Sequence, residues 1–282
     1  CRAGREIYIA RGGVLVSRIE PCFAALKERG EKAFIPFITA GDPTLDITEA
    51  LVLELEKAGA DIIEFGVPFS DPLADGPVNQ EAAQRALIND VTLEDILACV
   101  KSLRTKTQIP IMLFTYYNPV LAYGADALAA DAKESGVDGI LCVDLPPEEA
   151  TEYRASFAAQ GLDTVFLLAP TSTDERVKLI AEATSGFCYY VSRTGVTGEQ
   201  SSIESSVQPM VEKIKSLTDV PVAIGFGISN PDQAREIAGY GDGVVVGSAI
   251  VRMIGELGDT PDTAKKVGAF VKTLVDATKG RV

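Results

Sequence analysis

The sequence predicts an α/β protein, a single (β/α)8 TIM barrel with a short N-terminal helix and extra helical segments. Eight short runs rich in β-branched and aromatic residues alternate with helical segments, and no linker divides them. The length of 282 residues suits one large domain. An open, doubly wound sheet is the alternative arrangement. We expect residues 17–282 to form the barrel domain, and residues 1–16 to be an N-terminal arm, with a processing or cloning remnant as its open interpretation.

The eight predicted strands mostly lack a strict alternation of polar and apolar residues. That pattern is typical of strands that are buried on both faces of a parallel sheet. The strands are expected at residues 33–39, 61–67, 110–116, 139–145, 164–169, 187–192, 221–226 and 243–248.

The predicted helices have recognisable ends. Thr92, Thr173 and Asn230 are typical N-terminal caps, and Gly59 is a typical C-terminal stop. Prolines and the Gly247-Ser248 pair mark further helix starts. The helices are expected at residues 17–29, 46–57, 92–104, 147–159 and 261–278, and after Thr173, Asn230 and Gly247.

Composition and charge exclude several classes of function. A net charge of −14 argues against nucleic acid or an anionic membrane surface as a partner. The absence of histidine excludes histidine triads, imidazole acid–base catalysis and most catalytic zinc sites. No lysine falls at the carboxyl end of a predicted strand, where a Schiff base would form. The five cysteines contain no CxxC pair, so we expect free thiols in a reducing compartment. No apolar run reaches 18 residues, so we expect no membrane span.

Two carboxylates follow the second predicted strand. Glu64 interrupts an apolar strand, where burial would raise its pKa and make it a capable general acid or base. A purely structural acid, bonded to backbone donors or to a tyrosine hydroxyl, is the alternative. Asp75 lies in the loop after the strand, where it could also serve only the turn. The two acids at one strand mouth favour acid–base chemistry.

Glycine-bearing segments follow the last three strands. They include Gly198, Gly227 and the Gly247-Ser248 pair. Glycine lets backbone N–H groups approach an anion, and a helix that starts after the eighth strand favours a phosphate at its N-terminus. Residues 193–206 form a long polar loop, which predicts a lid over the site, with an ordinary surface loop as the alternative.

With these residues in place, the sequence resembles the tryptophan synthase alpha subunit family from about residue 23 to residue 274. The block Glu64–Pro77 is the most specific to that family, and residues 34–43, 195–198, 225–229 and 247–250 also match. The resemblance implies cleavage of indole-3-glycerol phosphate to indole and glyceraldehyde 3-phosphate. It implies no cofactor on this chain, and a pyridoxal-phosphate beta subunit as partner in an alpha2-beta2 heterotetramer.

The resemblance also implies roles for individual residues. Glu64 matches the general acid–base, and Asp75 matches the carboxylate that accepts from the indole N–H. The residues that match substrate contacts comprise the tyrosines Tyr116 and Tyr189, the lid threonine Thr197, the phosphate ligands Gly198, Gly227, Gly247 and Ser248, and the apolar walls Phe37, Leu141, Phe226 and Val245. The apolar residues fit an ordinary barrel core nearly as well.

Three other functions remain open. The segment Phe114–Pro119 resembles plant and cyanobacterial versions, so a stand-alone lyase that releases free indole is the alternative function. The others are a phosphate-binding isomerase and a non-catalytic barrel that only activates a beta subunit. We expect the protein in the cytoplasm, with the plastid stroma as the alternative.

Overall fold

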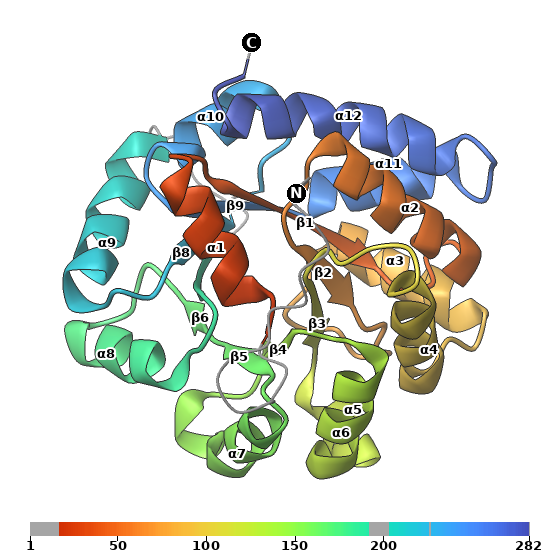
Figure 1. The fold of residues 1–282 in the computed structure, drawn as a ribbon, viewed down its shortest axis with the longest axis horizontal. Helices are drawn as coiled ribbons and strands as arrows, with labels where there is room; N and C mark the ends of the chain where they lie inside the picture. Colours follow the sequence, from red (N-terminus) through yellow and green to blue (C-terminus); the bar gives the residue numbers. More distant parts are fainter. Residues whose placement is uncertain (1–16, 192–202, 226, 282) are drawn as a thin grey trace.

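The structure is a computed structural model that describes residues 17–191, 203–225 and 227–281. Its strands form one sheet, and every recorded strand pair is parallel. The two ends of the strand order, β5 (Asp163–Val165) and β6 (Leu167–Leu168), are separated in the chain only by Phe166. The sheet therefore closes on itself, and Figure 1 shows helices around it. This confirms the predicted barrel and excludes the open sheet.

Each of the eight predicted strands is present, and most are shorter than predicted at their ends. The strand predicted at residues 164–169 is divided at Phe166 into β5 and β6. The other strands are β1 (Ala33–Thr39), β2 (Ile63–Gly66), β3 (Ile111–Thr115), β4 (Gly139–Cys142), β7 (Cys188–Val191), β8 (Val222–Gly225) and β9 (Gly243–Val246).

The helices divide into those that have clear terminal signals in the sequence and those that lack them. Thr92 forms a capping box, Thr173 and Asn230 each accept a backbone N–H, and Gly59 is left-handed, as those residue types predict. The confirmed helices are α1 (Ile19–Glu28), α2 (Leu45–Ala58), α4 (Leu93–Leu103), α8 (Asp174–Ala183), α10 (Pro231–Ala238), α11 (Ser248–Leu257) and α12 (Thr263–Thr278).

Two predicted segments, one helix and one loop, differ from the structure in their helical content. The helix predicted at residues 147–159 is a 3-10 turn, η1 (Pro147–Glu149), followed by α7 (Thr151–Ala159). The last four residues of the predicted lid belong to α9 (Ile203–Leu217), and the lid residues before Ile203 lie outside the described residues. Three further helices had no specific prediction: α3 (Pro77–Ile88), α5 (Tyr117–Tyr123) and α6 (Ala125–Ser135).

Side chains in β1 alternate between two apolar environments. Ala33 and Ile35 belong to the cluster that fills the barrel, whereas Phe34 and Ile38 belong to the cluster that packs against the surrounding helices. Both faces of the strand are apolar because each face is covered. The same alternation directs Glu64, the register partner of Phe37, toward the barrel interior.

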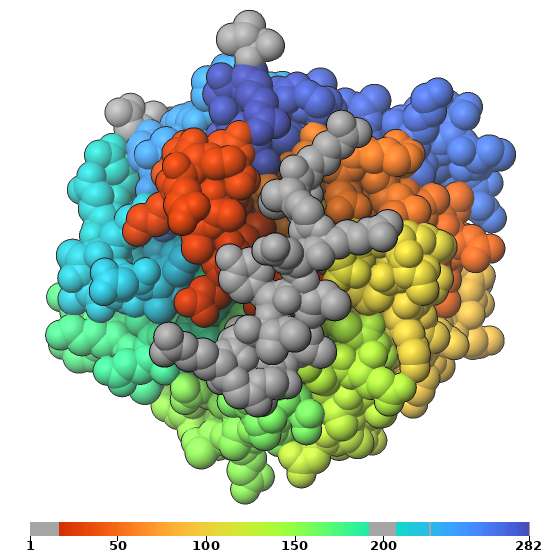
Figure 2. Space-filling view, viewed as in Figure 1, coloured from red at the N-terminus to blue at the C-terminus, as the bar shows by residue number. Residues whose placement is uncertain are grey.

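The N-terminal end of the barrel is covered by α1. Ile19, Phe23 and Leu26 join the interior cluster, and the ring of Phe23 lies 5.6 Å from that of Phe187. Figure 1 shows α1, in red, crossing this end of the barrel, and Figure 2 shows it beside the dark blue end of α12. An ion pair between Glu31 and Arg281 joins the segments that follow α1 and α12.

Three aspartates at this end tie neighbouring strands together. Asp61, Asp138 and Asp242 each lie just before a strand. Each accepts the backbone N–H of a residue near the start of the preceding strand in the chain, at 2.9 Å. Because these carboxylates are committed to backbone donors, this end of the barrel serves stability, and the opposite end is free for function.

The structure also bears on the cysteines and on membrane insertion. Cys22, Cys99, Cys142 and Cys188 are free thiols, as predicted. Among the helices that the structure describes, none combines the length and the hydropathy needed to cross a bilayer.

Candidate active site

The carboxyl group of Glu64 lies inside the barrel. The side chain is fully buried in β2, next to Phe37 and Met112 in the strand register. Neither carboxyl oxygen has a hydrogen-bond partner among the residues that the structure describes. Burial therefore raises the pKa of Glu64 from 4.5 to about 8. This absence of partners speaks against the alternative reading, a structural acid that is bonded to backbone donors or to a tyrosine.

The carboxyl group of Asp75 is held on both oxygens. The hydroxyl of Tyr116 donates to Oδ2 at 2.8 Å, and the amide of Asn79 donates to Oδ1 at 3.3 Å. Burial raises the pKa of Asp75, and these two hydrogen bonds oppose the rise. The backbone N–H of Asp75 also bonds Pro72 in a turn, so the residue serves the turn as well as presenting an oriented carboxyl group.

Tyr116 connects the strand-two loop to β3. Its hydroxyl accepts the backbone N–H of Ala74 at 3.0 Å and donates to Asp75, while its ring packs 5.2 Å from that of Phe69. The sequence suggested a substrate contact. In the structure the hydroxyl is engaged by the loop, so Tyr116 orients Asp75 in addition to lining the cavity.

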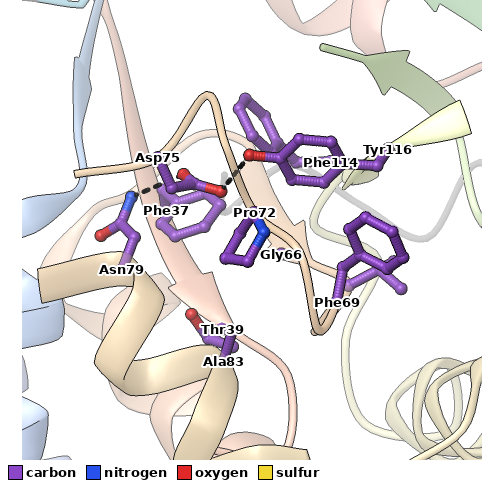
Figure 3. Close-up of a pocket in the computed structure, with 11 residues that line it drawn as sticks. Phe37, Thr39, Gly66, Phe69, Pro72, Asp75, Asn79, Ala83, Phe114 and Tyr116 are labelled. Atoms are coloured by element: carbon purple, nitrogen blue, oxygen red, sulfur yellow. Dashed lines mark hydrogen bonds between the residues drawn. The ribbon is translucent and has the colours of Figure 1, made fainter. Parts of the chain in front are cut away.

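A small cavity opens at the carboxyl ends of the first three strands. Its volume is about 20 Å³, which is room for about one water molecule. A larger ligand can therefore enter only if the surrounding side chains or loops move. The lining residues, most of which Figure 3 labels, are Phe37, Thr39, Gly66, Val67, Phe69, Pro72, Asp75, Asn79, Ala83, Phe114 and Tyr116.

Three more of the predicted residues lie within the barrel. Leu141 on β4 and Val245 on β9 belong to the interior cluster, and Tyr189 on β7 packs against that cluster. Burial raises the pKa of Tyr189 well above its usual range, and the negative charges of Glu64 and Asp75 add to the rise. Gly225 makes room for this ring, because a Cβ atom there would lie 2.7 Å from the Tyr189 hydroxyl.

The predicted phosphate ligands are partly described. Gly247 caps the N-terminus of α11, and Ser248 is its first residue, directly after β9. Gly247 lies beside the cavity, since a Cβ atom on it would contact Phe37 at 3.5 Å. Gly227 has a φ of +52°, in the left-handed region that favours glycine. Thr197, Gly198 and Phe226 lie outside the described residues.

Several residues of the site were not identified from the sequence. Asn79 stands four residues after Asp75 in the first turn of α3, and only the fold shows that its side chain reaches back to the carboxylate. Gly66 is needed because a Cβ atom there would lie 2.5 Å from the Phe37 ring. Phe114 packs edge-on against Phe37 at 5.2 Å. A glycine at the end of a strand that carries a buried acid is the one signal that the sequence offered.

Comparison with known proteins agrees with this geometry. Residues 23–279 match the sequence model of the family described as "Tryptophan synthase alpha chain". The tryptophan synthase alpha chains of Geotalea uraniireducens and Geobacter sulfurreducens are each 52% identical to this chain, over 94% of it and 98% of their own lengths.

Solved structures agree as well. The tryptophan synthase subunit alpha of Legionella pneumophila superposes with a TM-score of 0.86 at 35% identity, over 93% of this chain and 98% of its own. A chain of Mycobacterium tuberculosis tryptophan synthase superposes with a TM-score of 0.85 at 37% identity, over 94% of this chain and 99% of its own. The chain described here therefore belongs to the tryptophan synthase alpha chain family.

Proposed function

We propose that Glu64 and Asp75 carry the alpha reaction of tryptophan biosynthesis in this chain. The protein is a carbon–carbon lyase that splits indole-3-glycerol phosphate into indole and glyceraldehyde 3-phosphate. The observation that best supports the two roles is the burial of Glu64 with no hydrogen-bond partner on either oxygen, within the same barrel end that holds an oriented Asp75.

Glu64 begins the reaction as an acid. With a pKa of about 8 its carboxyl group is protonated at neutral pH, and it gives that proton to C3 of the indole ring. The ring becomes an iminium-like cation, which can accept the electron pair of the breaking carbon–carbon bond. Asp75 accepts the indole N–H and stabilises the positive charge. Tyr116 and Asn79 support this role, because each donates to a different oxygen of Asp75 and leaves lone pairs available.

Glu64 completes the reaction as a base. Its carboxylate takes the proton of the hydroxyl on the carbon attached to the ring. The electrons of that O–H bond form the aldehyde carbonyl, the carbon–carbon bond breaks, and its electron pair restores the indole ring. Glu64 is protonated again at the end, so one residue serves both steps without a net change.

The remaining residues bind the substrate. We assign the phosphate to Gly227, Gly247 and Ser248 together with Gly198, supported by the start of α11 beside the cavity. We assign Phe37, Leu141, Val245 and Phe226 to the apolar walls, supported for Leu141 and Val245 by their place in the interior cluster, against which Tyr189 packs. Thr197 would contact Asp75 from the lid.

The partner is a tryptophan synthase beta subunit, and we propose an alpha2-beta2 complex in the cytoplasm, with pyridoxal phosphate on the beta subunit. The strand-two loop supports a docking role, since Asp71 is exposed and Leu73, two residues further on, is 92% exposed. The segment Tyr117–Pro119 would lie at the same interface. The relatives are bacterial proteins, which favours the cytoplasm over the plastid stroma. We propose no nucleic acid or membrane partner.

The first experiment measures indole release from indole-3-glycerol phosphate by the purified chain, with and without a cognate beta subunit. Slow cleavage that the beta subunit accelerates, and that Glu64→Gln and Asp75→Asn abolish, supports the proposal. Rapid cleavage that is indifferent to the beta subunit identifies a stand-alone lyase. If Glu64→Gln cleaves at the wild-type rate, the catalytic assignment is wrong.

A further inference from the structure

Of the two polar atoms in the Asn79 side-chain amide, one forms a hydrogen bond to a described residue and the other does not. Its amide nitrogen donates to Asp75, whereas its Oδ1 is buried and meets no hydrogen-bond partner in the described part of the chain. This orientation is required, because a carboxylate oxygen of Asp75 accepts and the amide must therefore present its NH2 group. Figure 3 shows the nitrogen turned toward Asp75 and the oxygen on the opposite side.

The helix that carries Asn79 is firmly placed. Arg85, farther along α3, donates twice to the buried carboxylate of Asp42, at 2.7 and 2.8 Å. Ala82 of α3 packs with Phe37 and with Val251 of α11. Movement of Asn79 away from the site is therefore restricted, and its unpaired oxygen is held beside the cavity.

Asn79 lines the same cavity as Asp75, which we assign to the indole N–H. Its helix packs on α11, whose start we assign to the phosphate. Between its ring and its phosphate, indole-3-glycerol phosphate carries two hydroxyl groups, and a hydroxyl is the donor that an unpaired amide oxygen requires.

We propose that Asn79 determines specificity for the hydroxylated chain of the substrate, because its Oδ1 accepts a hydrogen bond from one of the two hydroxyl groups while its NH2 group orients Asp75. This inference rests on the proposed function. An alkyl phosphate without hydroxyl groups leaves Oδ1 unpaired, so it should bind more weakly than the hydroxylated substrate.

The test compares two ligands in the Glu64→Gln background, in which the substrate is bound without being cleaved. One ligand is indole-3-glycerol phosphate, and the other is indole-3-propanol phosphate, which keeps the ring and the phosphate and lacks both hydroxyl groups. Dissociation constants are measured by calorimetry for three proteins in this background: the one that keeps Asn79, the Asn79→Leu variant and the Asn79→Asp variant. Gln84→Ala, an exposed position of α3, is the control.

We expect Asn79→Leu to weaken binding of the hydroxylated ligand about tenfold relative to its effect on the propanol analogue. Asn79→Asp retains an acceptor, so it should preserve the preference for the hydroxylated ligand, and Gln84→Ala should change neither constant. Equal losses for the two ligands, or no loss for either, would overturn the proposal. Binding of the analogue shows that each variant is folded.

The same experiment separates this inference from the proposed function. If the wild-type chain neither binds nor cleaves indole-3-glycerol phosphate, the proposed function fails. If it cleaves the substrate and Asn79→Leu loses both ligands equally, only the role of Asn79 fails.

Discussion

Glu64 keeps its proton because its buried carboxyl group has no hydrogen-bond donor among the described residues. A carboxylate in an apolar barrel without donors is strongly disfavoured, so the proton stays on until about pH 8. Asp75 is also partly buried, but two donors favour its charged form. The two carboxyl groups therefore lie in different environments, one with donors and one without, as acid and charge-stabilising roles require.

The pH dependence of cleavage tests the acid role of Glu64. Because the protonated form starts the reaction, kcat/KM should fall as pH rises through about 8. Steady-state kinetics between pH 6 and 9.5 measure this. A profile that is flat to pH 9.5, or that rises through pH 8, would contradict the assignment.

Burial of Glu64 also makes the folded state less stable at high pH. Its pKa is about 8 in the folded chain and near 4.5 when exposed, so the unfolded state loses the proton first. Stability from this group is complete below pH 4.5, falls as pH rises from 4.5 to 8, and is lost above pH 8. Glu64→Gln lacks this loss. The free energy of unfolding of the variant, relative to that of the wild type, should therefore rise by about 3 kcal/mol between pH 5.5 and pH 9. Urea unfolding at both pH values measures it, and a constant difference would refute it.

Tyr116 acts on catalysis through the orientation of Asp75. Tyr116→Phe removes a donor to Oδ2 and leaves the Ala74 N–H without its acceptor, and we expect kcat/KM to fall about tenfold. On the acidic side of the pH profile, the rise of kcat/KM should shift to a higher pH, because this hydrogen bond lowers the pKa of Asp75. Tyr123→Phe removes a comparable hydroxyl–carboxylate bond to Asp131 on the surface and should leave the kinetics unchanged. Equal effects of the two variants would rule out a specific role.

At the scale of the element, terminal signals determined which helices could be predicted from the sequence. Caps at Thr92, Thr173 and Asn230 identified α4, α8 and α10. Helices α3, α5 and α6 have no side-chain cap, and α3 has only Pro77 at its first position as a signal. Their helical state depends more on packing against the barrel, which a local pattern does not reveal.

The capping box of α4 provides a test of a purely local contribution. Thr92→Ala removes the hydroxyl that accepts the Asp95 N–H and donates to the Asp95 carboxylate, whereas the backbone N–H of residue 92 still donates to that carboxylate. The free energy of unfolding should fall by about 1 kcal/mol. Activity should not change, because α4 does not line the cavity. Thr273→Ala, an exposed hydroxyl within α12, should change stability by less than about 0.5 kcal/mol. A loss of activity in Thr92→Ala would show that α4 is coupled to the site.

At the scale of the whole molecule, the sequence identified the two acids, and closure of the barrel determined their surroundings. Glu64 could be identified because a charged residue in an apolar strand is unusual. Its lack of partners could not, because that depends on which side chains of the neighbouring strands turn inward beside it. The bonds from Tyr116 and Asn79 to Asp75 likewise join segments whose separation is set by strand order and loop path.

The barrel also separates stability from catalysis along its axis. At the N-terminal end Asp138 accepts four hydrogen bonds, from the backbone and guanidinium of Arg18, from Arg104 and from the Ile111 N–H. At the carboxyl end the oxygens of Glu64 are left without donors. Hydrogen-bond donors therefore satisfy Asp138, the buried acid at the N-terminal end, whereas Glu64, the buried acid at the carboxyl end, has none among the described residues.

This separation predicts that Asp138 can be changed without loss of chemistry. Asp138→Asn leaves Arg104, whose side chain is 11% exposed, beside a neutral amide, and it should lower stability by about 3–5 kcal/mol. The expected fall in Tm is roughly 6–20 °C for a chain of this size. Below that transition kcat/KM should equal the wild-type value, because no contact of Asp138 reaches the cavity lining. Asp232→Asn removes the ion pair of a 93% exposed aspartate with Arg235 and should leave both quantities unchanged. A large drop in kcat/KM for folded Asp138→Asn would show that the two ends of the barrel are coupled.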